Sequence, residues 1–338
     1  MALTPKESGA FISAKSTFVT IKEEGVKSLA QKVYDELKQG KNIRLWSHRE
    51  HETFPSNLPE NDEVNWLFLL DALNFCFWTK KDDEKFSVEL KGKTFTGYFA
   101  LCAALHKALA NGITLLDPKS YKNLTLEDLR KIFIGINNKE MPLLNERLQC
   151  FHEIGEILEK KYDGSFVNCV KKANKSAQEL LKLVTTDFPC FNDSAYYCDK
   201  KVTFHKRAQI LIGDLWCLYY GQGISTFNDI DTISMFADYR IPQVLLFFGA
   251  LIYSDELTEK LKNEVILENG CLEEVEIRGC SIEVVERVNK IVHDMMKENN
   301  ENYRCNSILI DNYLWFYRRL HADELDSIPY HKVLSIYY

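Results

Sequence analysis

Residues 64–78, VNWLFLLDALNFCFW, decide the fold class of this chain. The segment is apolar on nearly every side, which is typical of a helix buried in a protein core and less often of a central strand. We interpret it as a helix, because apolar residues recur at helical spacing through most of the remaining sequence. The sequence therefore predicts a mainly α, multi-helix globular fold.

Further helices are expected on both sides of this segment. Thr4, Pro5 and Glu7 form a helix-start signal in which the threonine caps and the glutamate reaches back to the cap. Residues 26–37 are amphipathic and are followed by Gly40, a typical helix stop. The other expected helices are at 97–109, 125–133, 142–161, 176–184, 204–220, 242–253 and 282–296.

Two segments depart from helical spacing. Residues 45–63 contain proline, asparagine and histidine and predict a long loop, which in a compact domain usually has a function. Residues 86–96 alternate polar and apolar side chains around Gly92 and predict a short hairpin, the only convincing β signal in the chain. We expect one domain over residues 1–338, with a division into two lobes near residue 200 left open.

Composition limits the classes of function. The chain has 338 residues, of which 46% are hydrophobic, enough for a sizeable core. Its formal charge of −7 argues against stable, sequence-independent binding to nucleic acid, which needs a basic surface. A small anionic substrate is compatible with this charge, because a local basic pocket is enough to bind it.

Cysteine usage and the N-terminus indicate a cytoplasmic protein. The ten cysteines are scattered without a CxxC pair, and several fall in apolar helical patterns where free cysteine acts as a small core residue. No secretory signal opens the chain, and no apolar run approaches the ~20 residues that span a bilayer. We also expect no metal and no organic cofactor, because no metal-ligand spacing, GxGxxG or Walker-type loop is found.

Residues 236–243, FADYRIPQ, bring Asp238, Tyr239 and Arg240 together just before Pro242. Proline suits the first position of a helix, so Asp238 is expected in the turn that enters a helix. Its carboxylate could cap that helix or carry chemistry, and the residues alone leave both roles open.

This segment and four others closely resemble the queuosine salvage family, the queuosine 5'-phosphate N-glycosylase/hydrolases. The other segments are 4–13 (TPKESGAFIS), 64–78, 204–216 (FHKRAQILIGDLW) and 310–319 (IDNYLWFYRR), so the resemblance covers nearly the whole chain. It implies an all-helical enzyme, similar in its core to helix-hairpin-helix DNA glycosylases. Such an enzyme cleaves queuosine 5'-monophosphate into queuine and ribose 5-phosphate, for salvage into tRNA modification.

The resemblance also implies roles at the reacting bond. Cleaving an N-ribosidic bond builds positive charge on the sugar, which a carboxylate beneath the ring stabilises, and Asp238 is the catalytic candidate. It could also orient or deprotonate the attacking water. The 7-deaza base has no N7 to protonate, so its departure must be assisted by hydrogen bonds to its edge. Matching of motifs gives Phe236 as the stacking aromatic and Asp311 as the polar partner of the base.

Further substrate-binding residues are expected from the same match. His51 resembles the family's histidine that reaches the base, although His48 is close enough to compete for that assignment. Phe316 stands where similar proteins tend to carry an acidic residue, and Asn312 where they tend to carry an aromatic one. Asp311 and its neighbour Tyr313 could compensate in binding the charged arm of the base.

A phosphate needs basic partners, and Lys206, Arg207 and Arg240 are the candidates, helped by N–H groups of the helix after Ile241. Arg207 and Asp214 fall along one edge of the apolar stripe of 204–220, and Arg240 could also pair with Asp214. A structural salt bridge is therefore as plausible as a phosphate contact for one of these arginines.

Two other classes of function stay open. A nucleic-acid base glycosylase would suit the fold analogy, but the acidic balance weighs against it. A protein that captures queuine or its nucleotide without turnover is compatible with the departures at Asn312 and Phe316. The substrate expected first is queuosine 5'-monophosphate, and the oligomeric state does not follow from the sequence.

Overall fold

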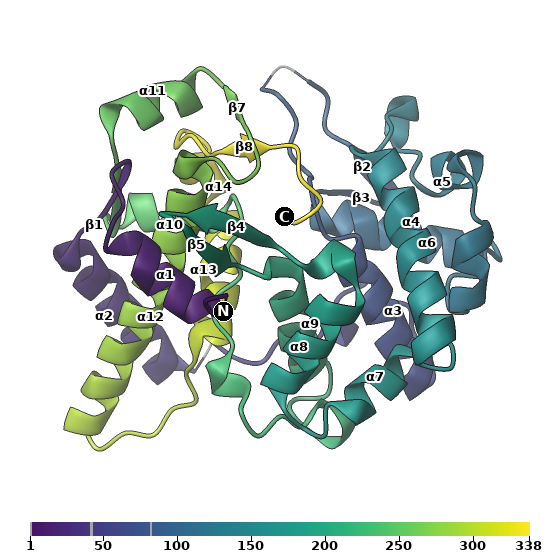
Figure 1. Ribbon diagram of the computed structural model, residues 1–338, viewed down its shortest axis with the longest axis horizontal. Coiled ribbons are helices and arrows are strands. Elements are labelled where there is room, and N and C mark those ends of the chain that lie inside the picture. The colour runs from purple at the N-terminus through teal and green to yellow at the C-terminus, as the bar shows by residue number, and fades with distance from the viewer. Residues whose placement is uncertain (1, 41–42, 82) are drawn as a thin grey trace. The chain divides into compact units, whose positions relative to one another are not determined.

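The computed structural model describes residues 2–40, 43–81 and 83–338. Helix accounts for 56% of the chain and strand for 8%, which confirms the mainly α prediction (Figure 1). Contacts divide the chain into two compact units, each built from three segments. The first unit takes the described residues of 1–45, 193–209 and 231–334, and the second takes those of 46–192, 210–230 and 335–338.

The first unit is organised around a long helix, α12. Its helices are α1 (Pro5–Ser13), α2 (Glu23–Gln39), α10 (Ile241–Phe247), α11 (Asp255–Lys262), α12 (Leu272–Glu298), α13 (Ser307–Leu320) and α14 (Ala322–Leu325). Helix α9 (Lys206–Leu218) begins in this unit and ends in the other. Three small sheets complete it, namely β1 (Val19–Ile21) with β6 (Leu251–Tyr253), β4 (Ser194–Tyr197) with β5 (Lys200–Thr203), and β7 (Ile266–Leu267) with β8 (Lys332–Val333).

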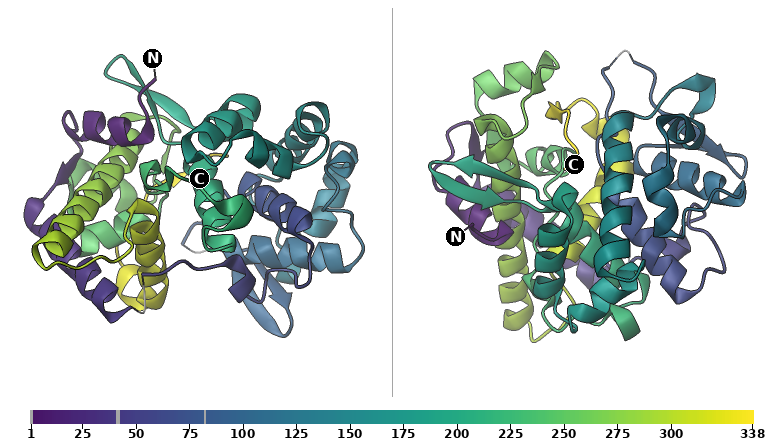
Figure 2. Two further views of the ribbon diagram at one scale, coloured as in Figure 1. Left: turned by 90° about the horizontal axis from the view of Figure 1, so that it is seen from below. Right: turned by 45° about the vertical axis from the view of Figure 1, so that its right-hand side comes forward.

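Helix α1 packs closely across α12, as both views show (Figures 1 and 2). Glycines allow this approach from each side. A Cβ atom at Gly279 would lie 2.5 Å from Ile12, and one at Gly9 would lie 2.8 Å from Ile282. Larger residues at either position would therefore push the two helices apart.

The start of α1 and the end of α2 confirm their sequence signals. Thr4 and Glu7 form a reciprocal capping box at α1, with Pro5 in the first turn. Helix α2 ends at Gly40, which adopts the left-handed conformation at φ 66°.

The second unit is a set of helices with one hairpin. Its helices are α3 (Glu60–Ala72), α4 (Tyr98–Ala110), α5 (Leu126–Ile132), α6 (Leu144–Lys161), α7 (Phe166–Lys172) and α8 (Ala177–Asp187). Strands β2 (Ser87–Leu90) and β3 (Lys93–Thr96) form the hairpin predicted around Gly92. The loop predicted over residues 45–63 is confirmed up to Pro59 and contains a short 3-10 turn, His48–Glu50. Its predicted end is wrong, because α3 already begins at Glu60.

The helix predicted over residues 64–78 is wrong at its C-terminal end. Helix α3 stops at Ala72, and Cys76 has a positive φ of 50° that helices exclude. The buried guanidinium of Arg147 donates to the carbonyl oxygens of Leu73 and Phe75, at 2.6 Å each. These carbonyls are satisfied without a further helical turn, so the apolar run continues as irregular chain.

The helix predicted over residues 242–253 is also too long. Helix α10 ends at Phe247, Gly249 turns the chain at φ 67°, and the apolar residues that follow form strand β6. A short apolar run is compatible with a helix or a strand, and here residues 251–253 form a strand because they pair with β1.

The hairpin at 86–96 is not the only β structure, because β4 and β5 form a second hairpin. Its two-residue turn, Cys198 and Asp199, has positive φ at both positions (45° and 60°). Such turns usually contain glycine, and without one the sequence signal was weak. Within the described ranges, no helix has both the length and the apolar character needed to cross a membrane.

Candidate functional site

A loop of the first unit, residues 234–240, carries the FADYR cluster and leads into α10. Helix α9 anchors the start of this loop through Gln209. The side chain of Gln209 accepts the N–H of Ser234 at 3.0 Å and donates to its hydroxyl at 2.9 Å. Two residues later, the N–H of Phe236 donates to the carboxylate of Asp311, on α13, at 2.9 Å. The loop is therefore fixed before it reaches Asp238.

Asp238 binds the start of α10 with one carboxylate oxygen. Oδ1 accepts the N–H groups of Arg240, the N-cap residue, and Ile241, the first helical residue, both at 2.8 Å. The side chain thus caps donors at the helix start from a position two residues before the N-cap. The other oxygen, Oδ2, receives no hydrogen bond from the residues that the structure describes. The side chain is half-buried. Capping therefore fixes the carboxylate in one orientation and leaves an acceptor oxygen for a ligand.

Opposing effects act on the pKa of Asp238, and their net result is a rise. Burial raises the pKa of Asp238, while the charge of Lys206 and the two N–H groups of Ile241 and Arg240 oppose that rise. A carboxylate that is fixed and partly desolvated can exert a stronger electrostatic effect than one in water.

Asp311 is a second carboxyl group in the same electrostatic environment. Its burial raises its pKa well above 3.8, and the negative charge of Asp238 raises it further. The N–H of Phe236 and the charge of Lys206 act in the opposite direction. Burial and the charge of Asp238 therefore both favour the protonated form of Asp311. Asp311 is neither a surface residue nor a helix cap, since it lies buried within α13.

Lys206 links these two acids electrostatically. It is the first residue of α9, its side chain is buried, and its N–H donates to Oδ2 of Asp193 at 3.1 Å. Its charge lowers the pKa of both Asp238 and Asp311. The first unit thus brings together a lysine and two carboxyl groups that are far apart in the sequence.

Arg240 lies next to this group and is held by aromatic rings. Its Nη1 donates to Gln243 at 3.0 Å, and its guanidinium lies 4.0 Å from the ring centre of Tyr330. Tyr330 also stacks on the buried ring of Tyr239, with centres 5.6 Å apart. Arg240 remains partly exposed, so its charge is accessible to an anion.

The other predicted residues of the first unit differ in exposure. Arg207 is almost fully buried, whereas Asn312 and Phe316 are half-buried on α13, one helical turn apart. Their predicted contacts with substrate stay predictions.

His51, His48 and Asp214 belong to the second unit. The ring of His51 stacks on Phe99 with centres 3.9 Å apart, and its Nδ1 lies 2.8 Å from the Thr53 hydroxyl. His48 is buried, with Nε2 2.9 Å from the Tyr98 hydroxyl and 3.4 Å from Asp214 Oδ2.

Burial lowers the pKa of His48 to about 3, so its imidazole is neutral. Of the two loop histidines, His51 is the more accessible, and its role in binding the base stays a prediction.

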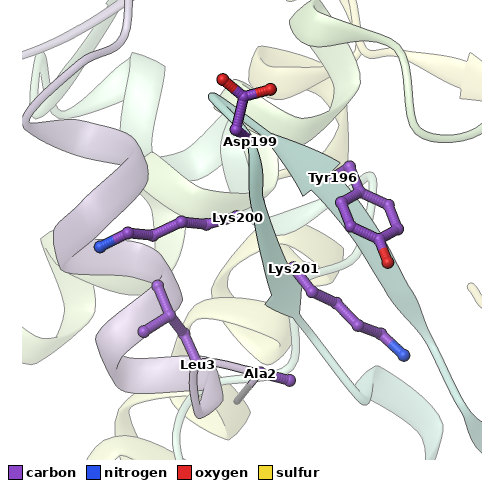
Figure 3. A pocket seen from close by; sticks show the side chains of 6 residues that line it. All are labelled: Ala2, Leu3, Tyr196, Asp199, Lys200 and Lys201. Carbon is purple, nitrogen blue, oxygen red and sulfur yellow. The ribbon is translucent and has the colours of Figure 1, made fainter.

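A pocket of the first unit lies elsewhere, between the N-terminal residues and the β4–β5 hairpin (Figure 3). Its lining residues are Ala2, Leu3, Tyr196, Asp199, Lys200 and Lys201. The two lysines point to opposite sides of β5, and none of the predicted site residues lines this pocket. In the described part of the chain, no three His, Cys, Asp or Glu side chains are grouped to hold a metal ion.

Sequence reasoning missed the residues that support the site. Asp193, Gln209, Arg278 and Tyr330 each bind or stack against a segment that carries a candidate residue. A signal existed for Arg278, because Glu274 precedes it by four residues, the spacing of an ion pair on one helix face.

Known proteins similar to this chain share one description. The family model described as "Queuosine salvage protein" matches residues 54–338. The chain is also similar to proteins named queuosine 5'-phosphate N-glycosylase/hydrolase. It is 42% identical to the one from Bos taurus, 41% to the one from Mus musculus and 39% to the one from Nematostella vectensis. Each alignment covers 99% of both chains, so the similarity extends over both units.

Proposed function

Because this chain belongs to the queuosine salvage protein family, we propose that it is an N-glycosyl hydrolase acting on queuosine 5'-monophosphate. The products are queuine and ribose 5-phosphate, and queuine can then re-enter tRNA modification. Relatives of matching length carry the hydrolase activity in their names. The observation that supports the chemistry best is the carboxylate of Asp238, fixed through one oxygen by two backbone N–H groups.

Asp238 stabilises the charge that develops on the ribose. As the bond from C1' to the base nitrogen stretches, its electron pair leaves with the base and positive charge builds on C1' and the ring oxygen. A carboxylate that is already oriented stabilises this charge without reorganising in the transition state. Water then adds to C1' and releases a proton to the carboxylate or to solvent, while the nitrogen of the departing base takes up a proton.

Asp311 assists departure of the base. A carboxyl group whose pKa lies well above its ordinary value holds its proton and can donate a hydrogen bond. Its Oδ1 is already an acceptor for Phe236, so the donor is the other oxygen. Such a donor stabilises negative charge on a 7-deaza base, whose ring has no N7 to protonate. The ring of Phe236 is our candidate for stacking on the base.

Two basic residues have different roles in this proposal. Lys206 is buried, and its charge favours the ionised form of Asp238 by opposing the rise in pKa that burial causes. Arg240 is partly exposed and pre-oriented by Tyr330, which suits binding of the 5'-phosphate. The predicted roles of His51, Arg207, Asp214, Asn312 and Phe316 stay predictions.

The activity is tested by incubating the purified chain with queuosine 5'-monophosphate and following free queuine by chromatography. Stoichiometric binding without free queuine would instead identify a capture protein. Retention of duplex DNA or RNA at modest salt would favour the nucleic-acid glycosylase alternative, against which the net charge of −7 weighs.

Three finer points belong to the same proposal. The core resembles that of helix-hairpin-helix DNA glycosylases, for which the mainly helical content is the support. The chain acts as one salvage domain over residues 1–338, because the relatives align along its whole length. It is cytoplasmic, and its ten free cysteines suit a reducing compartment.

A further inference from the structure

We propose that the buried pair Asp193 and Arg278 is a clamp that positions Lys206 and Asp238 for catalysis. Both residues lie in the first unit, and neither is expected to touch substrate. They are positioning residues, which act by connecting the backbone beside Lys206 to the backbone beside Asp238. This inference rests on the proposed hydrolase function.

Arg278, on α12, forms the centre of the clamp. Its Nε donates to the carbonyl oxygen of Ala237 at 3.0 Å, directly before Asp238. Its Nη1 and Nη2 donate to Oδ1 and Oδ2 of Asp193, at 3.0 and 2.5 Å, and Nη1 also contacts Glu274 at 3.1 Å. The guanidinium lies 4.1 Å from the ring centre of Phe204. A planar group held in this way has one orientation.

Asp193 connects this guanidinium to the start of α9. Its Oδ2 also accepts the N–H of Lys206 at 3.1 Å. Its backbone carbonyl accepts the N–H groups of Phe204 and His205, at 3.0 and 3.2 Å. His205 has a positive φ of 47°, an uncommon conformation for a non-glycine residue that this network holds in place.

A continuous path of hydrogen bonds therefore runs from the N–H of Lys206 through Asp193 and Arg278 to the carbonyl of Ala237. The two ends of this path adjoin the lysine and the carboxylate whose charges interact. Buried ion pairs often contribute little net stability compared with apolar residues of similar size, because desolvation offsets their attraction. Directional hydrogen bonds fix the distance between the two catalytic segments more specifically than apolar packing would.

Glu274 provides a matched control within the same network. It is as buried as Asp193 and binds the same guanidinium, and it also accepts the N–H of Gly270, which lies in neither catalytic segment. Asp193→Asn replaces one carboxylate oxygen by an amide NH2 group, so the bidentate contact with Arg278 is lost whichever way the amide is turned. Glu274→Gln can keep its acceptor towards Arg278 and leaves the path intact.

The experiment compares kcat, KM and hydrogen–deuterium exchange of wild type, Asp193→Asn and Glu274→Gln, after circular dichroism shows that each is folded. We expect Asp193→Asn to lower kcat for queuosine 5'-monophosphate by about 10- to 100-fold, the cost of misplacing a catalytic group. Its KM should change less than its kcat. Amides in peptides covering 204–209 and 236–241 should exchange faster in this variant than in Glu274→Gln, whose kcat should stay near that of wild type.

Equal losses of kcat in the two variants, with equal exchange, would overturn the clamp and indicate a general effect of the buried charges on stability. If Asp193→Asn does not fold, Arg278→Lys, which cannot form the bidentate contact, is compared with Glu274→Gln in the same way. Failure of the proposed function is recognised separately, because wild type would then release no queuine. The exchange comparison would still test whether the path orders the two segments.

Discussion

The carboxylate of Asp311 accepts the backbone N–H of Phe236 at 2.9 Å, and this bond ties helix α13 to the loop that carries Asp238. The same carboxyl group has a raised pKa to which the charge of Asp238 contributes. The side chain of Asp311 thus holds the loop in place, and its pKa depends on the charge of Asp238, the catalytic candidate in that loop.

Asp311→Asn should stabilise the protein at neutral pH relative to wild type. The pKa of Asp311 in the folded state lies well above 3.8, so folding becomes less favourable as the pH rises from about 3.8 through that raised pKa. Asparagine has no such cost and can still accept the N–H of Phe236. We expect the Tm of the variant minus the Tm of wild type to be larger at pH 7 than at pH 4, by about 2 °C or more.

Thermal unfolding at several pH values measures this difference, with exposed Asp255→Asn on α11 as the control. A difference in Tm between Asp311→Asn and wild type that does not change with pH would contradict the raised pKa. The same variant should release queuine more slowly, because it cannot donate as the carboxylic acid does.

Lys206→Met should shift the acid limb of the activity profile to higher pH. The charge of Lys206 lowers the pKa of Asp238, so its removal leaves the carboxylate protonated over a wider range. An opposite charge at close range typically accounts for about one pKa unit or more. The pH dependence of kcat measures the shift, and Lys206→Arg should restore much of the wild-type profile. An unchanged acid limb in Lys206→Met would exclude this role.

Arg147→Met should destabilise the second unit. The guanidinium donates to the carbonyl oxygens of Leu73 and Phe75, and to that of Pro142 at 2.9 Å. Each buried carbonyl left without a donor costs about 1–3 kcal/mol, so we expect a loss of about 3 kcal/mol or more in the free energy of unfolding. Denaturant unfolding followed by circular dichroism measures it.

The matched control is Arg130→Met, which removes an exposed ion pair with Glu140 and should cost about 1 kcal/mol or less. Similar losses in the two variants would show that the carbonyl contacts of Arg147 do not stabilise the end of α3.

His48→Gln should protect the protein against mild acid. The pKa of His48 falls from 6.5 to about 3 on burial, so the unfolded chain takes up a proton that the folded chain does not. The stability of wild type therefore falls as the pH decreases from about 6.5 towards 3. Glutamine does not titrate and can still bond the Tyr98 hydroxyl. Unfolding midpoints between pH 7 and pH 4 should fall less in the variant, and parallel curves would contradict the lowered pKa.

The helices that follow local rules could be predicted from sequence. The capping box at Thr4 and the stop at Gly40 depend on residues within a few positions of each other, and both are confirmed. The end of α3 depends instead on Arg147, about 70 residues away, which satisfies the carbonyls that a longer helix would have used. Periodicity cannot indicate such a distant donor.

The candidate site follows the same division. Asp238 was expected in a helix-entry turn because Pro242 follows it, and the structure places it there. The electrostatic coupling of Asp238 to Asp311 and Lys206 arises because the tertiary fold brings together residues far apart in the sequence, which no local pattern records. The support from Asp193 and Arg278 could not be predicted for the same reason.

The rate of queuine release by Asp238→Asn tests the central claim most directly. Asparagine can keep both capping bonds through its Oδ1, so the loop should stay in place while the negative charge is lost. We predict a fall in kcat of about 100-fold or more, the effect of removing a pre-oriented electrostatic group, with an unchanged circular dichroism spectrum and normal activity in Asp255→Asn. Turnover of Asp238→Asn close to that of wild type would contradict the account.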